Sequence, residues 1–195
     1  RRAVEKALDT ADRYPDPLCR ELRAKLGQAL NVPPEHIFCG NGAADVIFRL
    51  VRAKRPRTAM VTAPTFAEYE QALRESDCKV ESVQLDARQD FAVTETLLES
   101  IRPGLDLLFL CEPNNPTGRT TPRPLLQRIL EKCAACGTLL VVDECFNDFL
   151  DDPQAHTLQG ELETHPNLLI LRAFTKWYAM AGVRLGYALC ADEAL

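Results

Sequence analysis

The chain has 195 residues, enough for one large domain with a buried core or for two small ones. Hydrophobic residues make up 46% and charged residues 26%, and the net charge of −5 includes no basic block of the kind that nucleic-acid surfaces carry. The sequence contains no long apolar span and no signal-peptide core, so we expect a cytoplasmic protein whose partners include neither nucleic acid nor membrane.

Helical and strand patterns alternate along the chain. Apolar residues at helical spacing predict helices over 19–30, 43–54, 65–76 and 123–136, with Thr65 as an N-cap and Gly137 as a C-cap. Short apolar or alternating runs predict strands over 57–64, 79–85, 105–113, 138–144, 167–174 and 183–191. Residues 151–160 are expected to form a mobile loop. This alternation is typical of one α/β domain, with a largely parallel sheet that binds ligands at the carboxyl ends of its strands.

Two glycines precede the second predicted helix in "CGNGAADV", residues 39–46. Free N–H groups and the helix dipole favour an anion or phosphate there, held by Gly42, Ala43 and Ala44. A plain turn capped by Asn41 explains the same pattern. It is favoured for this segment taken alone, because the segment matches neither a Walker nor a dinucleotide fingerprint.

Two further segments follow predicted strands. Phe66 in "PTFAEY" could cover one face of a flat ring, although most phenylalanines of this kind pack in the core. The segment "EPNNPTG", residues 112–118, is more informative, because its two prolines and its glycine predict a rigid turn that fixes the direction of the Asn115 side chain. Phe66 and Asn115 are therefore expected at the same edge of the sheet.

A carboxylate and a lysine follow the next two buried strands. Asp143 in "VVDECF" needs a cationic partner, such as a protonated ring nitrogen, a metal or an arginine. Lys176 in "AFTKWYAMAGVRLGY" is either a surface lysine or an amine that forms a Schiff base, with Arg184 nearby to hold an anion. A phosphate site, a stacking aromatic, a fixed asparagine, a buried carboxylate and an exposed lysine together are what pyridoxal 5'-phosphate requires.

The eight cysteines fit packing better than chemistry. Most lie in apolar surroundings, where a free thiol packs as a small hydrophobe. Cys133 and Cys136 form a C-x-x-C pair, but no second pair stands at zinc-finger spacing, so packing is favoured over redox or metal chemistry. The three histidines are scattered among predicted loops, and no metal site is expected.

The segments "NNPTG", "VVDECF" and "FTKWYAMAGVRLGY", in that order, resemble the class I/II aminotransferases of the pyridoxal-phosphate fold type I group. Within that group the chain is most similar to histidinol-phosphate aminotransferases and to the threonine-phosphate decarboxylases of cobalamin biosynthesis, and "FAEYEQAL" and "RPLLQ" favour the decarboxylases. The resemblance implies a three-layer α/β/α large domain over residues 1–195. The family's N-terminal segment and C-terminal small domain are expected to lie outside these residues.

The resemblance also implies roles by position. Lys176 would form the Schiff base with the cofactor, and Asp143 would pair with its pyridine nitrogen. Asn115 would contact the ring hydroxyl, and Phe66 would stack on the ring. The phosphate would lie among Gly42, Ala43, Ala44, Thr175 and Arg184. Tyr14, in "RYPDP", matches a tyrosine that reaches the neighbouring subunit's cofactor, which implies a homodimer.

Phe146 separates the two closest branches, because aminotransferases usually carry there a tyrosine whose hydroxyl assists the ring oxygen. We therefore expect decarboxylation of a phosphorylated amino acid, threonine phosphate, with a histidinol-phosphate aminotransferase or another class I/II aminotransferase as the alternative. A non-catalytic aminotransferase-like binding domain is a remote alternative. It would lack the lysine or the aspartate, or would add a basic DNA-binding segment.

Overall fold

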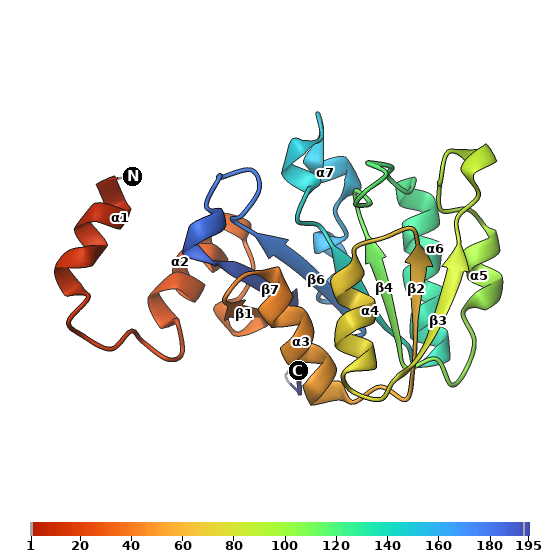
Figure 1. Cartoon of the computed structure of the whole chain (residues 1–195), viewed down its shortest axis with the longest axis horizontal. Helices are drawn as coiled ribbons and strands as arrows, with labels where there is room; N and C mark the ends of the chain where they lie inside the picture. The colour runs from red at the N-terminus through yellow and green to blue at the C-terminus, as the bar shows by residue number, and fades with distance from the viewer. Residues whose placement is uncertain (1, 193) are drawn as a thin grey trace.

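The computed structural model describes residues 2–192 and 194–195 (Figure 1). Its centre is a sheet of seven strands in the order β1-β7-β6-β5-β4-β2-β3. The strands are β1 (Ile37–Gly40), β2 (Thr58–Ala63), β3 (Lys79–Gln84), β4 (Leu107–Cys111), β5 (Leu139–Asp143), β6 (Leu168–Ala173) and β7 (Gly186–Cys190). Strand β7 runs antiparallel to β1 and β6, whereas the other paired strands are parallel. The expected, largely parallel sheet is confirmed.

Helices cover both faces of the sheet. The α-helices are α1 (Arg2–Ala7), α2 (Arg20–Leu30), α3 (Ala43–Lys54), α4 (Ala67–Arg74), α5 (Thr96–Ser100), α6 (Arg123–Cys136) and α7 (Pro153–His156). Short 3-10 helices span Leu8–Thr10, Pro34–His36, Ala87–Gln89, Asn147–Phe149, Gln159–Glu161 and Ala181–Val183. Apolar side chains of α2, α5 and α6 pack on one face, and those of α3 and α4 pack on the other. The expected three layers are therefore present.

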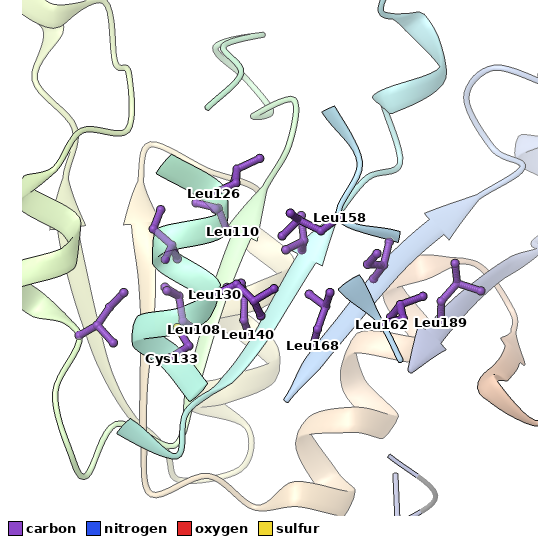
Figure 2. Close-up of a cluster of buried hydrophobic side chains, with 14 of the residues drawn as sticks. Leu108, Leu110, Leu126, Leu130, Cys133, Leu140, Leu158, Leu162, Leu168 and Leu189 are labelled. Carbon is purple, nitrogen blue, oxygen red and sulfur yellow. The ribbon is translucent and has the colours of Figure 1, made fainter. Parts of the chain in front are cut away.

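The central strands are buried on both faces, as their continuous apolar runs predict. Every residue of β4 and of β5 is buried. Leu108 and Leu140 belong to the cluster beneath α6, part of which Figure 2 shows, whereas Phe109 and Val141 belong to the cluster beneath α3 and α4. This alternation leaves the carboxyl ends of the two strands as the places where polar side chains emerge.

Neither Thr65 nor Asn41 is the N-cap residue that the sequence suggested. Helix α4 begins at Ala67 with Phe66 at the N-cap, and the Thr65 hydroxyl donates instead to Oδ1 of Asn114 (2.9 Å). Gly42 rather than Asn41 is the N-cap of α3. The Asn41 N–H donates to the Asp45 carboxylate inside the helix (3.0 Å), which closes the turn from the other side.

The segment predicted as a mobile loop, 151–160, instead contains α7 and the start of a 3-10 helix. Thr157 and Leu158 within it are buried, because the Thr157 hydroxyl and the Leu158 N–H both donate to the carboxylate of Glu144.

Strand β1 was not predicted, since four residues give too short a pattern to recognise.

The first residues of the chain extend away from the sheet (Figure 1). Helix α1 contains no buried residue, and the side chains of Val4, Leu8, Tyr14 and Leu18 are exposed. Within the described residues, none of the helices combines the length and the apolar character that crossing a membrane requires.

Gly186 allows β7 to approach the start of α3. A Cβ atom at Gly186 would lie 2.5 Å from both the backbone nitrogen of Ala43 and the carbonyl carbon of Gly42. Because Gly186→Ala must push the helix start away, we expect it to lower the free energy of unfolding by about 2 kcal/mol. Urea unfolding measures this loss. Gly160→Ala is the matched control, since the added methyl group would meet no atom within 4 Å, and equal losses in the two variants would contradict the argument.

Candidate active site

A pocket of about 180 Å³ lies at the carboxyl ends of β2, β4, β5 and β6. Nine residues that the sequence placed in a site line it: Ala43, Ala44, Phe66, Asn115, Asp143, Phe146, Thr175, Lys176 and Arg184. Gly42 stands beside it, against the Arg184 guanidinium. These residues come from five separate segments of the chain, which the strand ends bring to one edge of the sheet.

One end of the pocket suits an anion. The N-cap residue of α3, Gly42, has no side chain of its own to cap the helix, and its φ of 91° favours glycine. A Cβ atom at Gly42 would lie 2.6 Å from Nη2 of Arg184, so the guanidinium stands against the helix start. The free N–H groups and the dipole of α3 therefore act together with a cation.

The buried carboxylate of Asp143 is held by two donors. The Tyr69 hydroxyl donates to Oδ2 (2.7 Å), and the Cys145 N–H donates to Oδ1 (3.0 Å). Burial, together with the charge of Asp143, keeps the pKa of the Tyr69 hydroxyl well above its usual value, so this group remains a donor. A carboxylate has about four lone-pair positions, so Asp143 can accept a further donor from the pocket.

Lys176 follows β6 and is exposed at the pocket wall. Its Nζ lies 5.2 Å from the centre of the Phe146 ring, within the range of a cation–π interaction. Phe146 itself packs against Phe149, which meets Trp177 edge to face at a centroid distance of 5.2 Å. Aromatic side chains thus support the segment that carries the lysine.

The turn that carries Asn115 is tied down at several points. The Asn115 N–H donates to the Cys111 thiol sulfur (3.4 Å). The side-chain amide of Asn114 donates to the carbonyl of Pro64 (3.0 Å) and to the Thr117 hydroxyl (2.9 Å). The rigid turn expected from the prolines is present, and it is further fixed by contacts with the segment after β2.

Four lining residues were missed: Glu68, Cys111, Cys145 and Ala173. Tyr69 was missed too, although its position three residues after Phe66 in an amphipathic helix could have placed it on the buried face. Burial raises the pKa of the Cys111 thiol to about 12 and that of Cys145 well above its usual value. Such thiols stay protonated and pack as small hydrophobes.

The remaining two expectations concern Tyr14 and metal binding. Tyr14 is fully exposed and does not line the pocket, so its contact with a neighbouring subunit stays a prediction. In the described part of the chain, no three His, Cys, Asp or Glu side chains gather where they could hold a metal ion.

An α/β/α domain whose strand ends gather a lysine, a buried carboxylate and an anion site has the architecture of fold type I pyridoxal-phosphate enzymes. The chain belongs to the aminotransferase class I and II family, whose model matches residues 1–195. It is 40% identical over 194 residues to a threonine-phosphate decarboxylase of Salmonella typhimurium. The alignment covers 100% of this chain and 53% of that protein.

Two further relatives represent the two branches. A histidinol-phosphate aminotransferase of Bacteroides thetaiotaomicron is 35% identical over 187 residues, or 94% of this chain and 52% of that protein. The crystal structure of L-threonine-O-3-phosphate decarboxylase from Porphyromonas gingivalis superposes with a TM-score of 0.85 at 25% identity, over 97% of this chain and 55% of that one. The chain thus spans about half the length of the curated relatives it matches.

Proposed function

We propose that the chain forms the pyridoxal-phosphate-binding large domain of an enzyme that decarboxylates a phosphorylated amino acid, threonine phosphate. The observation that carries this proposal is the meeting of Lys176, Asp143 and the Arg184 anion site in one pocket. The 40% identity to a threonine-phosphate decarboxylase, against 35% to a histidinol-phosphate aminotransferase, favours the decarboxylase branch, as does Phe146. Histidinol-phosphate transamination is the second candidate.

The residues of the pocket fit pyridoxal phosphate. The start of α3 and Arg184 suit its phosphate, and the Asp143 carboxylate, with acceptor capacity left over, suits a protonated ring nitrogen. Phe66 would cover one ring face and Asn115 would meet the ring hydroxyl. When bound, the cofactor supplies an aldehyde that takes an amine and a ring that withdraws electrons from the attached carbon.

The chain's own groups would bind, orient and move protons around that cofactor. The Lys176 amine would replace the aldehyde oxygen, which leaves as water, and Nζ would afterwards carry protons. The Asp143 carboxylate would keep the proton on the ring nitrogen. Phe146 carries no hydroxyl and could not donate to the ring oxygen, so of these two residues only Asn115 would donate to it.

Substrate orientation chooses between the two candidate reactions. The bond that breaks at the substrate Cα is the one perpendicular to the ring plane, so decarboxylation needs the carboxylate there. Transamination instead needs hydrogen there, and it needs Lys176 to move that proton. The pocket described here would hold the cofactor end of this arrangement.

We also propose a homodimer, in which the exposed Tyr14 would reach the partner's cofactor. The exposed side chains of the first residues would then be covered by the second copy. Cytoplasmic location remains a prediction; the eight free thiols are compatible with a reducing compartment.

The first test is an absorbance spectrum of the full-length protein with added pyridoxal phosphate. Wild type is expected to gain a visible band that borohydride removes, and Lys176→Ala is expected to lack it, because the attaching amine is gone. Lys132→Ala, an exposed lysine on α6, is the matched control and should keep the band. A band of equal strength in Lys176→Ala would contradict the proposal.

The second test separates the two reactions. Carbon dioxide release from threonine phosphate supports the decarboxylase assignment. Conversion of histidinol phosphate without any release of carbon dioxide from threonine phosphate would contradict it and would establish the transaminase.

A further inference from the structure

Glu112 is a buried carboxylate that stands directly behind the pocket. It follows β4, is 4% exposed, and its N–H donates to the carbonyl of Asp143 (2.9 Å). Side chains alternate along a strand, and the preceding residue, Cys111, lines the pocket, so the Glu112 side chain points away from it. Glu112 therefore acts on the pocket only through its neighbours.

The partner of Glu112 is Thr121, at the far end of the turn that carries Asn115. Its oxygen Oε2 accepts the Thr121 N–H (2.7 Å), and Oε1 accepts the Thr121 hydroxyl. Both carboxylate oxygens are thus bound by one residue. Nine positions separate Glu112 from Thr121 in the sequence, so the contact closes the whole turn.

The turn has the register of a small hairpin. The Asn114 N–H donates to the carbonyl of Arg119 (2.8 Å), and two residues farther out on each side Glu112 faces Thr121. In an antiparallel pair the next contact would come from a backbone carbonyl. Here the Glu112 side chain accepts the Thr121 N–H in its place and fastens the base of the turn.

The hydrogen bonds from Thr121 stabilise the Glu112 carboxyl group, whose burial is energetically unfavourable. Burial raises the pKa of the Glu112 carboxyl to about 7, and the nearby Glu144 adds to this, although hydrogen bonds from Thr121 oppose it. Glu144 has its own cation, since Nη2 of Arg172 lies 2.7 Å from its Oε2. Among the described residues, the Glu112 carboxylate accepts hydrogen bonds only from Thr121.

We infer that Glu112 is a positioning residue for Asn115: by holding Thr121 it fixes the turn 113–121 and so the place of the Asn115 side chain in the pocket. The inference rests on the proposed function, because Asn115 would there donate to the cofactor's ring hydroxyl. The Thr121 N–H and hydroxyl both donate to the Glu112 carboxylate, which ties the far end of the turn to the end of β4.

The test combines hydrogen exchange with cofactor binding in the full-length protein. Without cofactor, Glu112→Ala is expected to speed exchange of the amides in 113–121 about tenfold, whereas Glu112→Gln, which can still pair with Thr121, stays within about twofold of wild type. Glu112→Ala is also expected to weaken pyridoxal-phosphate binding about tenfold, but to add less than about twofold when Asn115 is already alanine.

The matched control is Thr138→Val at the opposite end of β5, where a fully buried hydroxyl donates to the Leu105 carbonyl (2.7 Å). It removes a similar bond and should leave both readouts unchanged. Unaltered exchange in Glu112→Ala, or an equal loss of affinity with and without Asn115, would overturn the inference. A visible band of equal strength in Lys176→Ala would instead contradict the proposed function, while hydrogen exchange would still show whether Glu112 holds the turn.

Discussion

Arg172→Met is expected to lower the free energy of unfolding by about 3–5 kcal/mol, a large part of the stability of an ordinary domain. Arg172 on β6 donates through Nε and Nη2 to Oε2 of Glu144, which is 3% exposed. Removing the guanidinium leaves a carboxylate in the core without its cation, and that loss exceeds what the ion pair itself contributes. Urea unfolding at neutral pH measures the change.

Two further variants show whether the charge is the cause. Glu144→Gln combined with Arg172→Met removes both charges and should recover much of the loss, since Thr157 and Leu158 can still donate to the amide oxygen. Arg128→Met breaks an exposed pair with Glu95 and should cost less than about 0.5 kcal/mol. If Arg172→Met were no more harmful than Arg128→Met, burial of the pair would not matter.

Much of the fold could be predicted because local patterns agree with it. The helices 43–54 and 123–136 begin and end where their apolar periodicity predicts, and Gly137 is the left-handed C-cap. The buried strands β4 and β5 are continuous apolar runs. Since parallel strand ends meet at one edge, the position of Asn115, Asp143 and Lys176 after such strands was enough to place them in one pocket.

The remaining features depend on partners far away in the sequence. Tyr69 lies 74 positions along the sequence from Asp143, to which its hydroxyl donates. Thr65 lies 49 positions from Asn114, whose side-chain oxygen accepts a hydrogen bond from the Thr65 hydroxyl. Local spacing carries no information about such contacts. The contact between Glu112 and Thr121 was not predicted for another reason. A glutamate between an apolar strand and a proline turn gives no sign in the sequence that its carboxylate is buried.

Asp143→Asn is expected to lower kcat/KM of the full-length enzyme about a hundredfold or more, if the proposed function holds. The amide has the shape of the carboxylate but no negative charge, so it would not keep a proton on the ring nitrogen. The amide oxygen can still accept the Cys145 N–H, but the amide nitrogen would face the Tyr69 hydroxyl as a donor, so Tyr69 would no longer donate to this residue. Steady-state kinetics with threonine phosphate and the cofactor's binding curve measure both effects.

Tyr69→Phe separates the charge from its support. The variant removes the 2.7 Å hydrogen bond to Oδ2 of Asp143 but leaves the carboxylate and the stacking of the ring on Phe109. We therefore expect kcat/KM to fall about tenfold. The order of the two variants is the decisive observation. If Tyr69→Phe were as damaging as Asp143→Asn, placement of the carboxylate would outweigh its charge. If Asp143→Asn were fully active, the assigned role of Asp143 would be wrong, because an amide cannot act as the counter-charge of a protonated ring.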